Sequence, residues 1–423
     1  MKFDTVIIGG GLSGLVCGIR LQQQGQRCVI VSSGQSALHF SSGSFDLMSR
    51  LPNGDEVSNP LSSIKSLIDA YPDHPYSKLG EETFVRLASE ANSFFASIGL
   101  PMNGSSDKNH YRVTPMGTLK PTWLSTPNLA TSDSDVSLPW KKVSIFNISG
   151  FLDFYPQFIA GECAKMGVLS ETLLFSLPDI DYLRRNPSEL RATNIARVLD
   201  KDANKRELVS ILKKGSLDSD AIIFPACVGL ESPDVVDELQ EMVGKPIYLI
   251  PTLPPSIIGI HAQQYMHNYF IHLGGVYMLG DTVKKADVVD NKVTRIYSYN
   301  HGDIPFVAKN IVLATGSYFS QGLIASNEKI YEPVFNLDVN YEKDRSDWYD
   351  RNMFESQNYQ SFGVRTTKTF NALRQGAALE NLYVAGAILD GFDPIKEGSG
   401  AGVSILSALY IADRIIKKEG GIR

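Results

Sequence analysis

The pattern of apolar and polar positions is most regular at the N-terminus, where it predicts a strand, a helix and a second strand. Thr5–Ile8 is a short, largely apolar and β-branched run, typical of a buried strand in a parallel sheet. Apolar residues then recur at helical spacing until Gly25, at Leu12, Leu15, Val16 and Ile19. Cys28–Val31 is the next apolar run. Elements in this order predict a right-handed βαβ unit.

A glycine-rich turn joins the first predicted strand to the helix. Gly9, Gly11 and Gly14 stand in the spacing Gly-x-Gly-x-x-Gly, with Leu12 and Ser13 between the last two. Such glycines let the backbone approach a phosphate, whose negative charge is favoured at a helix N-terminus. The motif by itself is also compatible with a purely structural turn.

The acidic residue expected about 20 residues after such a turn, where it would bind a ribose hydroxyl, is absent. Ser32 and Ser33 occupy that end of the second predicted strand. The loop that follows is small and polar around one histidine, and in a doubly wound fold it leaves the sheet edge at which ligands bind. We expect Ser41, Ser42 and Gly43 to contact a cofactor and His39 to lie near its reactive ring. A hydrogen-bonded surface loop is the alternative.

The middle of the chain leaves the doubly wound pattern and then returns to an α/β rhythm. Glu82–Ile98 predicts an amphipathic helix. Arg112–Trp123 is a turn-rich segment that suits either an anionic-substrate pocket or a solvated hairpin. Strands are predicted at Val143–Phe146, Ala221–Phe224 and Pro246–Ile250. We therefore expect a smaller α/β domain inserted into the first.

Between the strands of this smaller domain, four arginines fall within 14 residues, namely Arg184, Arg185, Arg191 and Arg197. They could clamp a phosphate, although a charged helix face is the commoner arrangement. Pro251–Pro255 predicts a stiff connector back to the first domain, after which Ser256 caps a helix that reaches His272.

Glycine-containing segments also follow two predicted strands in the C-terminal third and open the last helix. Their residues are Ala314, Thr315 and Gly316; Gly386 and Ala387; and Gly398, Gly400, Ala401, Gly402 and Val403. This order resembles the signature of flavoproteins with two dinucleotide-binding motifs, in which the positive N-terminal end of the last helix faces the flavin. We predict that these residues bind a flavin together with the first glycine turn and Ser32. The predicted fold class is α/β, with a doubly wound (Rossmann-like) flavin-binding domain and an inserted smaller α/β domain.

Composition narrows the functional class. The net charge of −6 gives no reason to expect nucleic acid as a partner. Cys17, Cys28, Cys163 and Cys227 are scattered without a CxxC pair, so we expect no iron–sulfur cluster and no metal site. Cys17 and Cys28 lie in the nucleotide-binding unit, where we expect reduced core thiols of a cytosolic protein. The first strand begins at the N-terminus, so no signal peptide is expected, and no apolar run reaches the roughly 18 residues of a membrane span.

At 423 residues two domains are expected. We assign residues 1–50, 256–320 and 376–423 to a discontinuous flavin-binding domain. Residues 51–255 and 321–375 are assigned to an inserted substrate or partner domain.

Five blocks spread along the chain resemble a single family: Phe3–Ile7, Gly34–Ser44, Asn194–Arg197, Pro251–Ser256 and Gly391–Pro394. They are similar to the B subunits of bacterial anaerobic glycerol-3-phosphate dehydrogenases, over essentially the whole chain. The resemblance implies a flavoprotein component of a glycerol-3-phosphate:quinone oxidoreductase, which converts sn-glycerol 3-phosphate to dihydroxyacetone phosphate in anaerobic respiration. It implies two partners, a catalytic A subunit that contains FAD, and an iron–sulfur subunit. The latter would hold the pair peripherally at the cytoplasmic face of the inner membrane and pass electrons to quinone.

The flavin that the resemblance implies for the B subunits is FMN. The missing acid agrees with FMN, because Ser32 offers a hydroxyl but no charge to an adenosine ribose. FAD is the alternative, since a serine or a backbone group can also hold a ribose. Ala387 is a second departure, because many relatives of the fold place an acid there, and Asp390 or Asp393 could substitute for it.

The catalytic assignment follows from the same resemblance. If the chain oxidises substrate itself, we expect His39 to act as the base and Arg197, with its neighbouring arginines, to bind the phosphate. Two alternatives remain open. One is a non-catalytic component that relays electrons through its flavin and supports assembly, and the other is an unrelated soluble FAD-dependent oxidoreductase.

Overall fold

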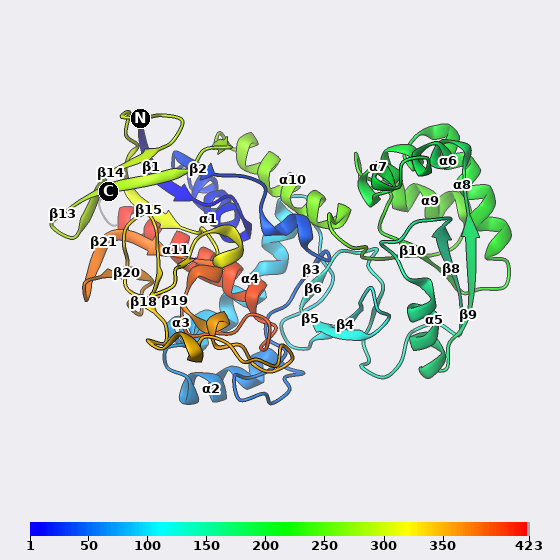
Figure 1. The fold of residues 1–423 in the computed structure, drawn as a ribbon, viewed down its shortest axis with the longest axis horizontal. Coiled ribbons are helices and arrows are strands. Elements are labelled where there is room, and N and C mark those ends of the chain that lie inside the picture. The colour runs from blue at the N-terminus through cyan, green and yellow to red at the C-terminus, as the bar shows by residue number, and fades with distance from the viewer. Residues whose placement is uncertain (421–423) are drawn as a thin grey trace.

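The computed structural model describes residues 1–420 and has two lobes (Figure 1). The larger lobe is built on a six-stranded sheet in the order β12-β2-β1-β15-β21-β20, in which only β20 runs antiparallel to its neighbour. The strands are β1 (Lys2–Ile8), β2 (Cys28–Ser32), β12 (Val276–Leu279), β15 (Val307–Leu313), β20 (Asn371–Arg374) and β21 (Ala377–Val384). The predicted α/β class and the N-terminal βαβ unit are confirmed.

Three helices pack beside this sheet, namely α1 (Leu12–Gln23), α10 (Ile257–His272) and α11 (Gly400–Gly420). The apolar spacing of α1 places Leu15, Val16 and Ile19 in the core without any exposure. Where α1 meets α10 only glycine fits at residue 18, because a Cβ there would lie 2.9 Å from the Phe270 ring. Ser256 caps α10 as predicted, its Oγ accepting the Gly259 N–H at 3.2 Å.

The predicted amphipathic helix is α4 (Glu81–Ser97), which packs against α11, as does α3 (Pro75–Leu79). α2 (Pro60–Ala70) packs on α3 and α4. The turn-rich Arg112–Trp123 segment forms a hairpin of β4 (His110–Val113) and β5 (Leu119–Thr122), extended by β7 (Thr131–Ser132). The remaining strands of this lobe pair two by two: β3 (Ser44–Phe45) with β6 (Leu124–Ser125), β13 (Val283–Val289) with β14 (Lys292–Ser298), β16 (Ile324–Ala325) with β17 (Ile330–Tyr331), and β18 (Val339–Asn340) with β19 (Gly363–Val364).

The smaller lobe is a second α/β unit, drawn at the right of Figure 1. Its sheet, β11-β10-β8-β9, is entirely parallel. The strands are β8 (Lys142–Ile148), β9 (Leu169–Phe175), β10 (Ala221–Pro225) and β11 (Ile247–Ile250), and the helices are α5 (Pro156–Lys165), α6 (Pro178–Arg184), α7 (Ala192–Leu199), α8 (Asp202–Gly215) and α9 (Val235–Val243). β9 was not predicted from the sequence, because this edge strand is largely exposed and lacks the continuous apolar run of a central strand.

The two hydrophobic cores divide the chain differently from the predicted domain boundaries. Most buried apolar residues between Val57 and Leu124 pack into the core of the larger lobe, and Val113 is an exception. Most of the smaller core lies between Leu129 and Ile258. Residues 323–372 also contribute to the larger core. The apolar face of α4 explains the difference, since Phe84 packs against Tyr76 and Phe95 against Phe45. The segments assigned to the insertion at 51–124 and 321–375 therefore belong to the larger lobe by packing.

Candidate functional site

A cavity of about 930 Å³ opens at the carboxyl ends of β1, β2 and β15 and reaches the N-termini of α1 and α11. This volume lies within the range of small-molecule and cofactor sites. In open α/β sheets this edge is where ligands bind. The position of the cavity therefore makes it the candidate site.

The three glycines of the N-terminal turn have different physical roles. Gly9 has φ +110°, and a Cβ there would collide with the carbonyl of Ala314. A Cβ on Gly14 would collide with the Gly9 carbonyl, so this glycine allows α1 to approach β1. At Gly11 the nearest atom to an added Cβ is Ser36 Cβ at 3.7 Å. Gly11 lines the cavity, and the open space beside it leaves room for a ligand at the backbone.

The N-terminus of α1 is suited to an anion. Gly11 is the N-cap residue and offers no capping side chain, and the first turn holds no acidic residue. The first N–H groups of a helix have no intrahelical partner and carry a partial positive charge. Leu12 and Ser13 line the cavity at this point. A phosphate group fits this arrangement of donors.

The cavity continues beyond the turn, past the end of β2. Ser32 donates its Oγ–H to the Gly34 carbonyl at 2.9 Å, and Thr282, Val283 and Lys284 line the same end of the cavity. Asp281 also lines it and is 2% exposed. Sequence reasoning missed this acid, which follows β12, the strand that pairs with β2.

The carboxylate of Asp281 is held by a dense set of donors. Oδ1 accepts the N–H groups of Thr282 and Asn300, each at 2.9 Å, and Oδ2 lies 2.9 Å from His301 Nδ1. Burial by itself raises the pKa of Asp281, but hydrogen bonds from Ser298, Asn300 and His301 outweigh burial and hold the pKa below its ordinary value.

The opposite end of the cavity is lined by Ser41, Phe45 and Ala387, and by Gly400 and Ala401 at the start of α11. The first turn of α11 holds no acidic residue, so its positive end is available to a negatively charged group. Glu332 also lines the cavity. Its carboxylate accepts the N–H groups of Val334 at 2.9 Å and Phe335 at 2.7 Å, and its pKa is nevertheless raised by burial.

Two buried hydroxyls of neighbouring residues have no hydrogen-bond partner within residues 1–420: Thr315 Oγ1, and Tyr318 OH, which is outside the cavity lining. Thr315 lines the cavity. Buried polar atoms are normally paired. The Thr315 hydroxyl in the cavity wall is therefore available to hydrogen-bond a bound molecule.

The predicted cofactor-binding residues divide into two sets. Those that line the cavity are Gly9, Gly11, Leu12, Ser13, Ser32, Ser41, Ala314, Thr315, Gly316, Ala387, Gly400 and Ala401. Those outside its lining are Gly14, Ser42, Gly43, Gly386, Gly398, Gly402 and Val403. Several of the second set serve close packing: a Cβ on Gly386 would meet Ser13 Oγ, and one on Gly398 would meet Ser49 Oγ.

Neither His39 nor Arg197 lines the cavity, although Leu38 and Ser41, on either side of His39, do. His39 belongs to a 3-10 turn, Ala37–Phe40, where its carbonyl accepts the Ser256 N–H and partial burial lowers the pKa of its ring. Arg197 is exposed on α7 in the smaller lobe, 3.0 Å from Asn194 Oδ1.

The other three arginines of that group have separate partners. Arg184 pairs with Asp181, Arg185 stacks on Tyr182 and Arg191 pairs with Asp153. The two acids considered as substitutes at Ala387 are also engaged elsewhere. Asp390 pairs with Lys78 at 3.1 Å, and Asp393 Oδ1 accepts the N–H groups of Ile395 and Lys396.

Comparison with known proteins identifies the family. The family model described as FAD binding domain matches residues 4–403. A relative from Yersinia enterocolitica, the B subunit of its anaerobic glycerol-3-phosphate dehydrogenase, is 50% identical over 417 residues, 98% of each chain. The chain belongs to this family of B subunits. A further member, from Actinobacillus pleuropneumoniae, is 40% identical over 98% of this chain and 99% of its own. Similarity to solved structures is weak: 3-ketosteroid delta1-dehydrogenase from Sterolibacterium denitrificans aligns at a TM-score of 0.46 with 9% identity, over 99% of this chain and 100% of that one.

The match to an FAD-binding domain gives no support to FMN, the flavin predicted from the family resemblance. The prediction relied in part on the missing acid at Ser32. The cavity does not end there, because it extends past Ser32 to Thr282–Lys284, which follow the neighbouring strand β12. The absence of a carboxylate at residue 32 therefore does not shorten the site.

Three further observations concern membrane spans, metal ligands and cysteines. Within the described part of the chain, no helix combines the length and apolar character needed to cross a bilayer. The same residues contain no cluster of three or more histidine, cysteine or acidic side chains placed to hold a metal ion. All four cysteines are free and buried.

Proposed function

We propose that this chain is the flavin-bearing B subunit of an anaerobic glycerol-3-phosphate:quinone oxidoreductase, and that its flavin is FAD. The observation that carries the proposal is the extent of the cavity on both sides of the α1 N-terminus. FMN ends at its phosphate, whereas FAD continues through a pyrophosphate into adenosine. A cavity that extends in both directions from the phosphate-binding position suits the longer molecule.

The residues of each section of the cavity suit one part of FAD. The N–H groups of Leu12 and Ser13 would bind the pyrophosphate. Ser32 and Val283 would line the adenosine. Ala387 and Gly400 would lie along the flavin ring, and Thr315 would supply a hydroxyl.

Bound FAD supplies a hydride acceptor for alcohol oxidation. The chain contributes the N-terminus of α11, whose partial positive charge stabilises negative charge on a neighbouring group. Because no acid in the first turn of α11 offsets this charge, the stabilisation is retained.

The complex would oxidise sn-glycerol 3-phosphate to dihydroxyacetone phosphate and pass the electrons to quinone. Its other components would be a catalytic A subunit that contains FAD, and an iron–sulfur subunit that holds both flavoproteins at the cytoplasmic face of the inner membrane. The family name, which describes one component of a multi-component dehydrogenase, supports this assembly.

A second version of the proposal has this chain relay electrons while the catalytic A subunit oxidises the substrate. Alcohol oxidation needs a base to take the hydroxyl proton. The cavity lining contains three ionisable side chains, Asp281, Lys284 and Glu332. Both carboxylates are already bonded to backbone N–H groups. Neither carboxylate is therefore free to act as the base, and His39 does not line the cavity. The lining favours the electron relay over substrate oxidation by this chain.

Flavin affinity tests the cofactor assignment. We expect the flavin-free chain to bind FAD at least about tenfold more tightly than FMN, a difference of about 1.4 kcal/mol in binding free energy. Quenching of flavin fluorescence measures the binding. ADP should compete with FAD, since it occupies the pyrophosphate and adenosine sections alone. Equal affinities for FAD and FMN, without competition by ADP, would refute the assignment.

Substrate addition separates the two versions. The flavin-loaded chain is mixed anaerobically with excess sn-glycerol 3-phosphate, and the flavin absorbance is followed. The relay predicts a flavin that stays oxidised until the catalytic partner is added, although dithionite reduces it directly. Bleaching by substrate alone would show that this chain oxidises glycerol 3-phosphate itself.

A further inference from the structure

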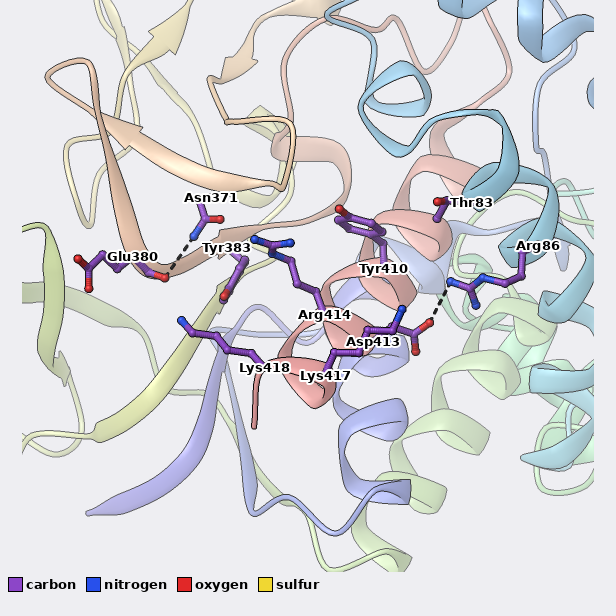
Figure 2. A pocket seen from close by; sticks show the side chains of 10 residues that line it. All are labelled: Thr83, Arg86, Asn371, Glu380, Tyr383, Tyr410, Asp413, Arg414, Lys417 and Lys418. Carbon is purple, nitrogen blue, oxygen red and sulfur yellow. Dashed lines mark hydrogen bonds and ion pairs between the residues drawn. The ribbon is translucent and has the colours of Figure 1, made fainter. Parts of the chain in front are cut away.

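A second cavity, of about 470 Å³, lies beside the C-terminal half of α11 (Figure 2), whereas the proposed flavin cavity lies at the N-terminus of this helix. It is formed by α4, by β20 and β21, and by the C-terminal half of α11. α11 has 21 residues and is therefore about 30 Å long. The two cavities thus lie at opposite ends of one helix.

One face of α11 supplies most of the charge in this second cavity. Tyr410, Arg414, Lys417 and Lys418 follow the spacing i, i+4, i+7 and i+8, which places them on the same side of the helix. Figure 2 shows these side chains along the cavity, with Arg414 directed toward β21. They form a cationic strip in a protein whose net charge is −6.

The three cations of this strip have no carboxylate partner. Within residues 1–420, Arg414, Lys417 and Lys418 make no ion pair. Arg86, across the cavity on α4, differs from them: it pairs with Glu90 at 3.0 Å and with Asp413 at 3.2 Å. The carboxylate of Glu380 is the remaining acid of the lining. The cavity therefore keeps an excess of uncompensated positive charge.

Hydroxyl groups complete the lining. Tyr383 is 1% exposed as a residue and lines the cavity from β21. Thr83 on α4 and Tyr410 on α11 also line the cavity. Three hydroxyl-bearing side chains from three elements therefore line the cavity beside the cations.

Helix electrostatics account for only part of this arrangement. Lysines in the last turn offset the negative end of a helix dipole, which explains Lys417 and Lys418 by themselves. The dipole does not explain Arg414, one turn earlier. Nor does it explain why Thr83 and Tyr383, from α4 and β21, bring hydroxyl groups to the lining of the same cavity.

We propose that this cavity binds a small phosphate ester. Arginine and lysine can only donate hydrogen bonds, and a phosphate monoester offers acceptor oxygens with nearly two negative charges. The planar Arg414 fork matches two phosphate oxygens, and the two lysines supply further charge. The hydroxyls of Thr83, Tyr383 and Tyr410 suit a hydroxylated ester group. The volume is sufficient for a small ligand but not for a nucleotide cofactor of the length proposed for the first cavity.

Site-resolved lysine acylation tests this proposal on the flavin-loaded full-length chain. The rates at Lys417 and Lys418 are measured by mass spectrometry with and without glycerol 2-phosphate or inorganic phosphate. Lys213 and Lys214 are an internal control, because they are also adjacent, exposed lysines in the last turn of a helix. Glycerol, and sodium chloride at equal ionic strength, control for the neutral polyol and for screening.

At a ligand concentration ten times the dissociation constant, acylation of Lys417 and Lys418 should slow by about tenfold, with Lys213 and Lys214 unchanged. Arg414→Gln should abolish this protection, and Tyr383→Phe should weaken it. Retained flavin absorbance shows that both variants are folded. Equal slowing of both lysine pairs, or no slowing, would overturn the proposal. Protection by an acidic peptide but not by either phosphate compound would overturn it as well, in favour of a protein-docking surface.

Discussion

His74 Nε2 lies 3.0 Å from Glu397 Oε2, and both side chains are fully or almost fully buried. His74 caps α3 by accepting the Tyr76 N–H at Nδ1, so its Nε2–H is the donor to Glu397. Glu397 also accepts the Asp393 N–H and the Ser399 hydroxyl. The pair therefore joins α3 to the segment that leads into α11, whose N-terminus lines the cavity proposed to bind flavin.

His74→Ala should destabilise the protein by about 3 kcal/mol, because it leaves a buried acceptor without its partner. It should also weaken flavin binding by releasing the start of α11. Urea unfolding and flavin titration measure the two effects. Arg50→Ala is the matched control: its pair with Glu56 at 2.8 Å is exposed, so the loss should stay below about 1 kcal/mol. Equal effects of the two substitutions would contradict the role given to the buried pair.

Gly11→Ala and Gly14→Ala should separate ligand approach from packing. The Cβ on Gly11 meets no atom closer than 3.7 Å, so stability should fall by less than about 1 kcal/mol while flavin affinity falls by at least about tenfold. The Cβ on Gly14 meets the Gly9 carbonyl, so this variant should lose about 1–3 kcal/mol of stability. Thermal unfolding without flavin, and flavin titration, provide the comparison. Unchanged affinity in Gly11→Ala would refute phosphate binding at this turn.

Asp281→Asn should lower stability at pH 7 and have a smaller effect below about pH 4. The hydrogen bonds to Asp281 hold its folded pKa below the unfolded value of about 3.9. Such a group stabilises the fold above the unfolded pKa, and this contribution disappears as the pH falls through the folded pKa. The measurement is the urea midpoint from pH 7 to pH 3. Asp303→Asn, on an exposed turn, should show no difference at either pH. If the urea midpoint of Asp281→Asn differed from that of the wild type by the same amount at every pH, the ionic role of Asp281 would be contradicted.

Substitution of the two residues assigned to catalysis from the sequence tests that assignment. His39 and Arg197 belong to different lobes, and neither lines the flavin cavity. We expect His39→Gln and Arg197→Gln to leave flavin content and flavin reduction in the assembled complex within about twofold of wild type, or about 0.4 kcal/mol. A loss of more than about a hundredfold in either variant would restore that residue to the mechanism.

Local features of the fold could be predicted from the sequence, because they are encoded by neighbouring residues. The Gly9–Gly14 turn, α4 and the Ser256 cap of α10 are examples. Features that depend on distant segments could not be predicted. Asp281 reaches the cavity only because β12 pairs with β2, and residues 57–124 join the larger core only because α4 packs there. The second cavity was missed because it forms only where the cationic strip of α11 faces Tyr383 on β21.

The mass and amount of flavin released by denaturing the purified chain test the central claim most directly. If the cavity binds FAD from the α1 N-terminus through to Thr282–Lys284, mass spectrometry should find one FAD per chain and no FMN. FMN as the released cofactor would contradict the FAD assignment. A chain purified with no flavin, and unable to take up FAD afterwards, would contradict the site itself.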